Sequence, residues 1–141
     1  MARNIKFGTD GWRAKIAEDY TFENVRYCTQ GTAEYLLKEG LAERGMVVGY
    51  DMRFLSEDFA AAAAEVLAGN GITAYLAKRA EPTPVLSYAI LPLRAAGGIW
   101  ITASHNPPAD LCRRRRPRDA DRGRGAHPYR PGRETPQAHG L

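Results

Sequence analysis

Residues 46–76 read MVVGYDMRFLSEDFAAAAAEVLAGNGITAYL, and this stretch decides the fold. The short, continuous apolar run at 46–50 is typical of a strand that is buried on both faces. Ser56 can cap a helix whose alanine-rich body is a strong helix former, and the glycines at 69 and 71 end it. Residues 72–76 are a second strand candidate. The stretch therefore predicts a strand–helix–strand unit with parallel strands.

The flanking sequence continues this alternation in both directions. Upstream, Thr21 can cap a helix whose apolar positions recur every three or four residues, and Gly40 can end it in a left-handed conformation. Downstream, Thr83 as cap and Pro84 at the first helical position predict a third helix, and residues 99–102 predict a third strand. The predicted fold class is α/β: a three-layer α/β/α sandwich around a mostly parallel, mixed sheet.

The charge is divided unevenly along the chain. Residues 1–110 hold 11 Lys/Arg and 13 Asp/Glu, whereas residues 111–141 hold nine arginines and three acids. From 113 to 140 there is no Ile, Leu, Val, Phe, Met or Trp, so that segment cannot bury enough apolar surface to offset the entropy of ordering. We therefore predict a folded domain over 1–110 and a disordered, basic tail over 111–141.

Cysteine use and hydropathy indicate the compartment. Cys28 and Cys112 are far apart and neither belongs to a CxxC pair, so no disulfide or zinc site is predicted. Cys28 lies in a helical pattern and is expected to be a small buried hydrophobe. No apolar run reaches membrane-spanning length and no signal-peptide core follows Met1, so the expected location is the cytoplasm, without a membrane partner.

The residues that suggest chemistry follow the third predicted strand. Residues 102–107 read Thr-Ala-Ser-His-Asn-Pro and lie where ligands of open α/β sheets bind. Pro107 keeps Asn106 out of helical geometry, so Ser104 and His105 are expected on a braced loop. Successive backbone N–H groups there can form an anion-binding nest, and a serine beside an imidazole suits phosphoryl transfer. The alternative is that Ser104 is an ordinary turn or cap residue.

This loop resembles the phosphoserine loop of the α-D-phosphohexomutases, the phosphoglucomutase and phosphomannomutase superfamily. Three other segments resemble the same family in the same order. Residues 7–13, FGTDGWR, resemble the amino-terminal loop that opens onto the active site, and 48–53, VGYDMR, resemble the first strand and its Asp-x-Arg ending. Residues 82–84, PTP, resemble the approach to the third helix. The resemblance covers about residues 4–110.

The resemblance implies intramolecular phosphotransfer on hexose phosphates. A phosphorylated Ser104 would give its phosphoryl group to the substrate and regain one from the bisphosphate, with Mg²⁺ bound through that phosphate and a hexose 1,6-bisphosphate as activator. Arg13 would support the phosphate or assist proton transfer. His105 and Asn106 would shape the loop and contact the phosphate. Thr9 is expected at the phosphate site, with turn formation as its alternative role.

Four other residues have plainer interpretations. Asp51 and Arg53 are expected to form a structural ion pair or to brace a loop, because surface Asp-x-Arg pairs are common. Trp12 and Trp100 are expected to be packing residues rather than platforms for a sugar.

The sequence departs from the family after residue 110. Four arginines, 113–116, replace an Asn-Gly-x-Lys type strand, and the Asp-rich metal loop and the sugar- and phosphate-binding domains are missing. We therefore expect an isolated chain that does not bind Mg²⁺ alone and is inactive, with an open sheet edge and marginal stability. The abrupt change of composition suggests an out-of-frame tail.

Two other functions remain open from the sequence. One is a non-catalytic module that binds a phosphosugar or a protein partner. The other is a nucleic-acid binder that uses the basic tail, for which only Tyr129 supplies an aromatic ring, so no specific nucleic-acid recognition is predicted. The sequence leaves the preferred sugar and the oligomeric state undetermined.

Overall fold

The computed structural model of the chain describes residues 5–9, 11–103 and 110–117. Strands and helices alternate along most of this length, as the sequence predicts. In chain order the elements are β1 Trp12–Lys15, α1 Phe22–Lys38, the short 3₁₀ helix η1 Ala42–Arg44, β2 Met46–Tyr50, α2 Ser56–Gly69, β3 Ala74–Leu76, α3 Thr83–Ala89, β4 Gly97–Thr102 and β5 Asp110–Pro117.

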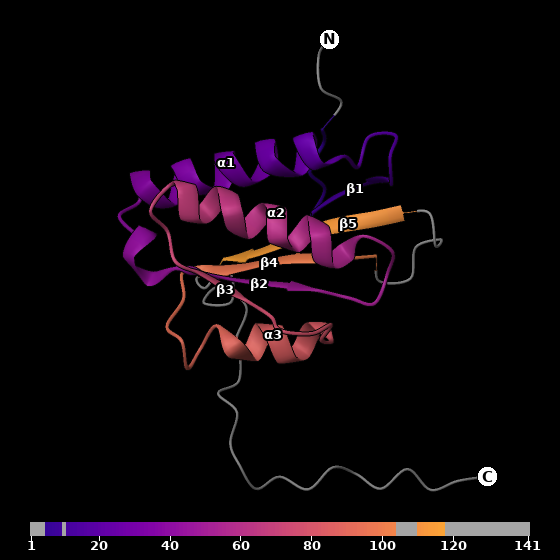
Figure 1. Cartoon of the computed structure of the whole chain (residues 1–141). Coiled ribbons are helices and arrows are strands. Elements are labelled where there is room, and N and C mark those ends of the chain that lie inside the picture. The colour runs from indigo at the N-terminus through magenta and orange to yellow at the C-terminus, as the bar shows by residue number, and fades with distance from the viewer. Residues whose placement is uncertain (1–4, 10, 104–109, 118–141) are drawn as a thin grey trace, which may run out of the picture.

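The strands form one five-stranded sheet in the order β1-β5-β4-β2-β3. β2 pairs in parallel with both β3 and β4, while β5 runs antiparallel to β4 and to β1. Helices α1 and α2 cover one face of this sheet and α3 covers the other (Figure 1). The prediction of a three-layer α/β/α sandwich with a mostly parallel, mixed sheet is confirmed.

Both tryptophans are packing residues, as predicted. Trp12 lies under α1 and α2, where its ring stacks on Tyr20 with centroids 4.7 Å apart, and Tyr20 meets Phe59 edge-on at 4.9 Å. Trp100 lies on the other face of the sheet with Leu86 of α3. Each tryptophan is 2% exposed. The sheet therefore has a separate apolar core on each face.

β5 corrects the prediction of disorder from residue 111 onward. Residues 111–117 belong to a strand that crosses the predicted boundary at 110 and pairs with β1 over 110–113 and with β4 over 112–117. The open edge expected beside β4 is therefore filled. A strand forms here despite the lack of apolar side chains, because backbone hydrogen bonds to neighbouring strands do not depend on side-chain hydropathy. The prediction for 118–141 lies outside the described residues.

The helix ends agree with the sequence in α1 and differ in α2 and α3. Thr21 caps α1 by accepting a hydrogen bond from Asn24 N–H at 3.2 Å, and Gly40 after its end has the predicted left-handed φ of 66°. Ser56 is not the cap of α2 but its first residue, because its hydroxyl is engaged elsewhere. Thr83 is likewise the first residue of α3, after Pro82.

Candidate functional site

The strand register brings the amino-terminal segment to the end of β4. Arg13 of β1 pairs with Cys112 of β5, and Cys112 pairs with Thr102, the last residue of β4. The backbones of Arg13 and Thr102 are thus two strand spacings, roughly 10 Å, apart. The segment that carries Ser104 leaves β4 from this end. Two segments that are about 90 residues apart in sequence therefore lie level with each other at one end of the strands, with β5 between them. Sequence spacing alone does not predict this.

A pocket of about 360 Å³ lies in the amino-terminal segment. Gly8 N–H donates to Gly11 C=O at 2.9 Å and closes the turn, and Gly11 has a φ of 138°, which favours glycine. Thr9 and Arg13 both line this pocket, so the structure brings two of the predicted site residues together. A hydroxyl and a guanidinium in one concave site are suited to binding a phosphate.

Lys6 also lines this pocket, although it is not among the predicted site residues. Lys6 adds a second cation to the pocket. It comes before the turn at residues 8–11, whereas Arg13 comes after it. The signal was present, because a lysine stands two residues before the glycine that opens the turn. Without the pocket, an exposed lysine cannot be told from an ordinary surface residue.

The predicted residues Ser104, His105 and Asn106 lie outside the described residues. The structure describes the residue that leads into them, Ala103, whose side chain is fully buried at 0% exposure. Its backbone N–H donates to Oδ2 of Asp51 at 3.1 Å. The start of the candidate phosphoserine loop is therefore tied to the end of β2.

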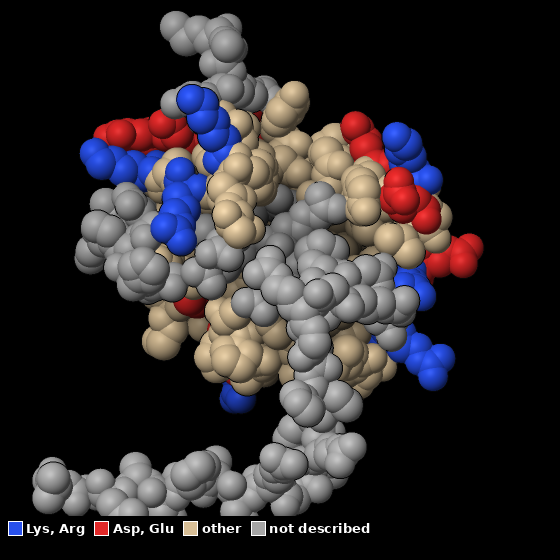
Figure 2. Space-filling view, turned by 180° about the vertical axis from the view of Figure 1, so that it is seen from behind, with Lys and Arg blue, Asp and Glu red and all other residues tan. Residues whose placement is uncertain are grey.

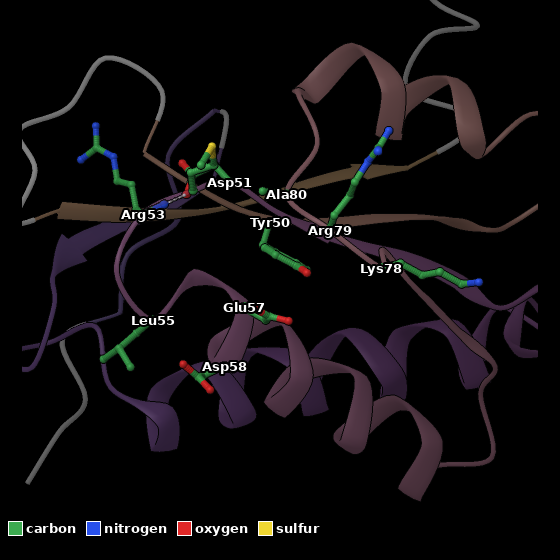
Figure 3. A pocket seen from close by; sticks show the side chains of 10 residues that line it. Tyr50, Asp51, Arg53, Leu55, Glu57, Asp58, Lys78, Arg79 and Ala80 are labelled. Carbon is green, nitrogen blue, oxygen red and sulfur yellow. Dashed lines mark hydrogen bonds between the residues drawn. The ribbon is translucent and has the colours of Figure 1, made fainter.

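Asp51 braces this region, which confirms one of the two structural roles expected for it. Its Oδ1 accepts from the backbone N–H of Arg53 at 3.0 Å and from the Ser56 hydroxyl at 2.8 Å. Figure 3 shows the Arg53 guanidinium pointing away from the Asp51 carboxylate. The contact that joins the two residues is thus a backbone hydrogen bond rather than the expected ion pair.

A second pocket, of about 430 Å³, lies beside Asp51 at the carboxyl ends of β2 and β3. Tyr50 is 4% exposed, and in Figure 3 its hydroxyl points toward Glu57. Burial, and then the charge and hydrogen bond of Glu57, raise the pKa of Tyr50. Across the pocket, the hydrogen bond from Arg79 to Glu81, 2.6 Å long, raises the pKa of Arg79. Opposite charges are mixed here, so the pocket favours no single sign of ligand.

The described residues do not fit a magnesium site. Among them, no group of three or more His, Cys, Asp or Glu side chains converges as a metal would require. Asp51, the acid at the stem of the loop, already accepts three hydrogen bonds through its two oxygens.

Among the residues that the structure describes, no helix has the length and apolar character needed to cross a membrane.

Comparisons with known proteins agree with this geometry. Residues 4–111 match the family model described as phosphoglucomutase/phosphomannomutase, alpha/beta/alpha domain I. A "Probable phosphomannomutase" of Haemophilus influenzae is 51% identical over 86 residues, which are 61% of this chain and 18% of that protein. A phosphoglucomutase of Staphylococcus saprophyticus is 41% identical over 106 residues, 73% of this chain and 19% of that protein.

A solved structure shows the same likeness in three dimensions. The "putative phosphomannomutase" of Thermus thermophilus superposes with a TM-score of 0.78 at 42% identity, over 83% of this chain and 26% of that chain. The chain spans about a fifth of the length of the curated relatives it matches. The similarity therefore concerns one domain of proteins that are several times longer.

Proposed function

The chain belongs to the phosphoglucomutase/phosphomannomutase family, and from this premise we propose that it forms the serine-bearing half of a phosphohexomutase active site. The observation that carries the proposal is the strand register. Arg13, which lines a pocket with Lys6 and Thr9, is level in this register with Thr102, the last residue of β4 before the chain continues to Ser104. The substrates we propose are hexose phosphates, and the location that suits them is the cytoplasm.

The proposed reaction transfers a phosphoryl group between Ser104 and the sugar. When the sugar is phosphorylated, the bond between phosphorus and Ser104 Oγ breaks, a bond to the sugar hydroxyl oxygen forms, and the hydroxyl proton passes to Oγ. The reverse step, on the other phosphate of the bisphosphate, restores the phosphoserine. Such a transfer depends on positioning and on neutralising phosphate charge.

Each residue has a proposed part in this transfer. Lys6 and Arg13 neutralise the phosphate as it moves, and the Thr9 hydroxyl donates a hydrogen bond to one of its oxygens. His105 and Asn106 shape the loop and contact the phosphate. Magnesium would supply further charge neutralisation in the family, but the described residues do not hold it, so no step is derived through the ion.

Intact-mass analysis tests the proposal directly. The 141-residue chain is incubated with glucose 1,6-bisphosphate and magnesium, beside Ser104→Ala. We expect one phosphate adduct that Ser104→Ala abolishes. Arg13→Gln and Lys6→Gln should slow its formation, roughly tenfold for each lost charge-assisted contact. Lys15→Gln is the matched control, because Lys15 is on the same strand as Arg13 and pairs with Glu18 outside the pocket.

The outcomes separate catalysis from binding. An adduct that persists in Ser104→Ala, or no adduct in the unaltered chain, contradicts the phosphoserine proposal. Saturable binding of a hexose phosphate without phosphorylation would instead identify a non-catalytic phosphosugar-binding module, which the Lys6 and Arg13 pocket also favours. Turnover between hexose phosphate isomers is not expected from these residues alone.

Nucleic-acid binding has little support from the described surface. β5 holds Arg113, Arg114, Arg115 and Arg116 in a strand whose backbone pairs with β4 at all four positions and with β1 at Arg113. On the face shown in Figure 2, basic and acidic side chains of the described residues lie next to one another at both flanks. Nucleic-acid binding that disappears when 118–141 are deleted would favour this alternative.

A further inference from the structure

We infer that Asp51 is the positioning residue of the Ser104 loop, because its carboxylate fixes the stem from which that loop leaves β4. The structural part of this inference stands on the contacts of Asp51 and Ala103. Its consequence for phosphoryl transfer rests on the function proposed above. Asp51 thereby has a role beyond bracing its own turn.

Asp51 holds the end of β4 at two points. Its backbone N–H donates to Ile101 C=O at 3.1 Å, which continues the parallel ladder between β2 and β4 by one rung. Its side-chain Oδ2 then accepts from Ala103 N–H at 3.1 Å. A side chain thus supplies the acceptor that a backbone carbonyl supplies elsewhere in the ladder. The position of residue 103, directly before Ser104, is fixed from β2.

The other carboxylate oxygen anchors Asp51 itself. Oδ1 accepts from the Ser56 hydroxyl at 2.8 Å and from Arg53 N–H at 3.0 Å, and Ser56 is fully buried at the start of α2. Three donors therefore converge on two oxygens, which only a carboxylate satisfies. An asparagine offers one oxygen and an NH₂ group, and that NH₂ group would face a donor.

The hydrogen bond from Ala103 N–H to the Asp51 carboxylate, called the clamp below, is separate from the phosphate pocket. Lys6, Thr9 and Arg13 line a different cavity from the one that Asp51 lines. Removing the clamp should therefore leave the affinity for the sugar bisphosphate nearly unchanged. It should lower the maximal rate of Ser104 phosphorylation, because phosphoryl transfer depends on how the reacting oxygen is positioned.

Hydrogen exchange of the Ala103 amide, followed by NMR in the whole 141-residue chain, tests the clamp itself. In Asp51→Asn we expect this amide to exchange roughly ten- to a hundredfold faster, as the loss of a hydrogen bond to a charged group predicts. The Val25 amide in α1, bonded to Thr21 C=O, should be unaffected and reports that the fold is intact. Asp58→Asn is the matched control, since Asp58 lines the same pocket and is exposed.

Ser56→Ala keeps the test decisive if Asp51→Asn does not fold. It removes one anchor of Asp51 and leaves the Ala103 contact in place, so a smaller acceleration at Ala103 is expected. If neither variant changes Ala103 exchange relative to Val25, or if Asp58→Asn changes it equally, the inference is wrong.

Phosphorylation kinetics test the functional consequence separately. In Asp51→Asn the maximal rate should fall at least tenfold, with the half-saturating bisphosphate concentration unchanged. A fall in affinity at an unchanged rate would overturn the positioning role. If the unaltered chain takes up no phosphate, the proposed function fails in this chain, and the Ala103 amide alone decides whether the clamp exists.

Discussion

The side chain of Leu86 occupies the space that a Cβ on Gly49 would need. Gly49 lies in the fully buried strand β2, and Leu86 of α3 is 4% exposed. Helix α3 therefore sits directly on the strand at this glycine. Gly49→Ala should force Leu86 or the helix to move, and the free energy of unfolding should fall by about 1–3 kcal/mol. Urea unfolding measures this fall.

Gly31→Ala is the matched control for that substitution. Gly31 is exposed within α1, and a Cβ added there meets nothing within 4 Å. The variant should gain about 0.5–1 kcal/mol, because alanine loses less conformational entropy than glycine in a helix. A Gly49→Ala protein as stable as the unaltered chain would show that α3 does not pack on β2 as described.

The raised pKa of Tyr50 predicts a loss of stability at alkaline pH. Its neutral form is favoured by burial and by Glu57, so the stabilisation is complete below the ordinary tyrosine pKa and is lost as the pH rises above it. The free energy of unfolding should therefore fall as the pH rises above about 10, the ordinary tyrosine pKa. Glu57→Gln should shift the Tyr50 pKa downward, toward its ordinary value, and make the fall smaller.

Tyrosine absorbance at alkaline pH measures the same group directly. The chain holds seven tyrosines, so the titration of Tyr50→Phe is subtracted from that of the unaltered chain to isolate Tyr50. The difference curve should lie above the ordinary tyrosine range, and Glu57→Gln should move it down. A difference curve that Glu57→Gln leaves in place would mean that burial alone raises the pKa.

The parallel part of the fold could be predicted because the local sequence preference of each element there agrees with the structure that the element adopts. The apolar run of β2, the alanines of α2 and the proline at the start of α3 each favour the structure they adopt. β1 and β5 could not be predicted, since the apolar alternation of β1 covers only four residues and β5 has none. Their pairing depends on neighbours that are far away in sequence.

Candidate site residues that belong to a recognisable motif could be predicted from the sequence. Those that are defined only by their contacts in the structure could not. Thr9 and Arg13 were predicted through the family resemblance, and both line one pocket. Lys6 and the three hydrogen bonds of Asp51 were missed, because an exposed lysine and an Asp-x-Arg pair are common on protein surfaces. Only the register shows that Arg13 is level with the carboxyl end of β4.

The side-chain amides of Gln30 and Asn70 predict a coupling between α1 and α2. Asn70 Nδ2 donates to Gln30 Oε1 at 2.8 Å, and Gln30 Nε2 donates to Asn70 Oδ1 at 3.2 Å. Asn70→Ala should lower the free energy of unfolding by about 1–2 kcal/mol. In a double-mutant cycle with Gln30→Ala the two losses should not be additive. Additive losses would show that the amides do not interact in solution.

The register of β5 predicts that arginine is unfavourable at two of its positions. Leu111 is fully buried in the core under α1 and α2, and positions 113 and 115 follow it at the two-residue period of a strand. Across the ladders, Arg113 pairs with Trp12 and Ile101, and Arg115 with Ile99, all three of which are buried in that core.

Replacing Arg113 and Arg115 by valine should therefore stabilise the chain. Each valine places an apolar side chain opposite buried apolar ladder partners, and the expected gain is about 1–3 kcal/mol per residue in the free energy of unfolding. Arg44→Val, at an exposed arginine, removes the same charge as each of these substitutions and should stay within about 0.5 kcal/mol of the unaltered chain. Urea unfolding compares the three proteins. A double variant no more stable than Arg44→Val would mean that β5 does not pair with β1 and β4 in this register, since the same substitutions would then reach no core.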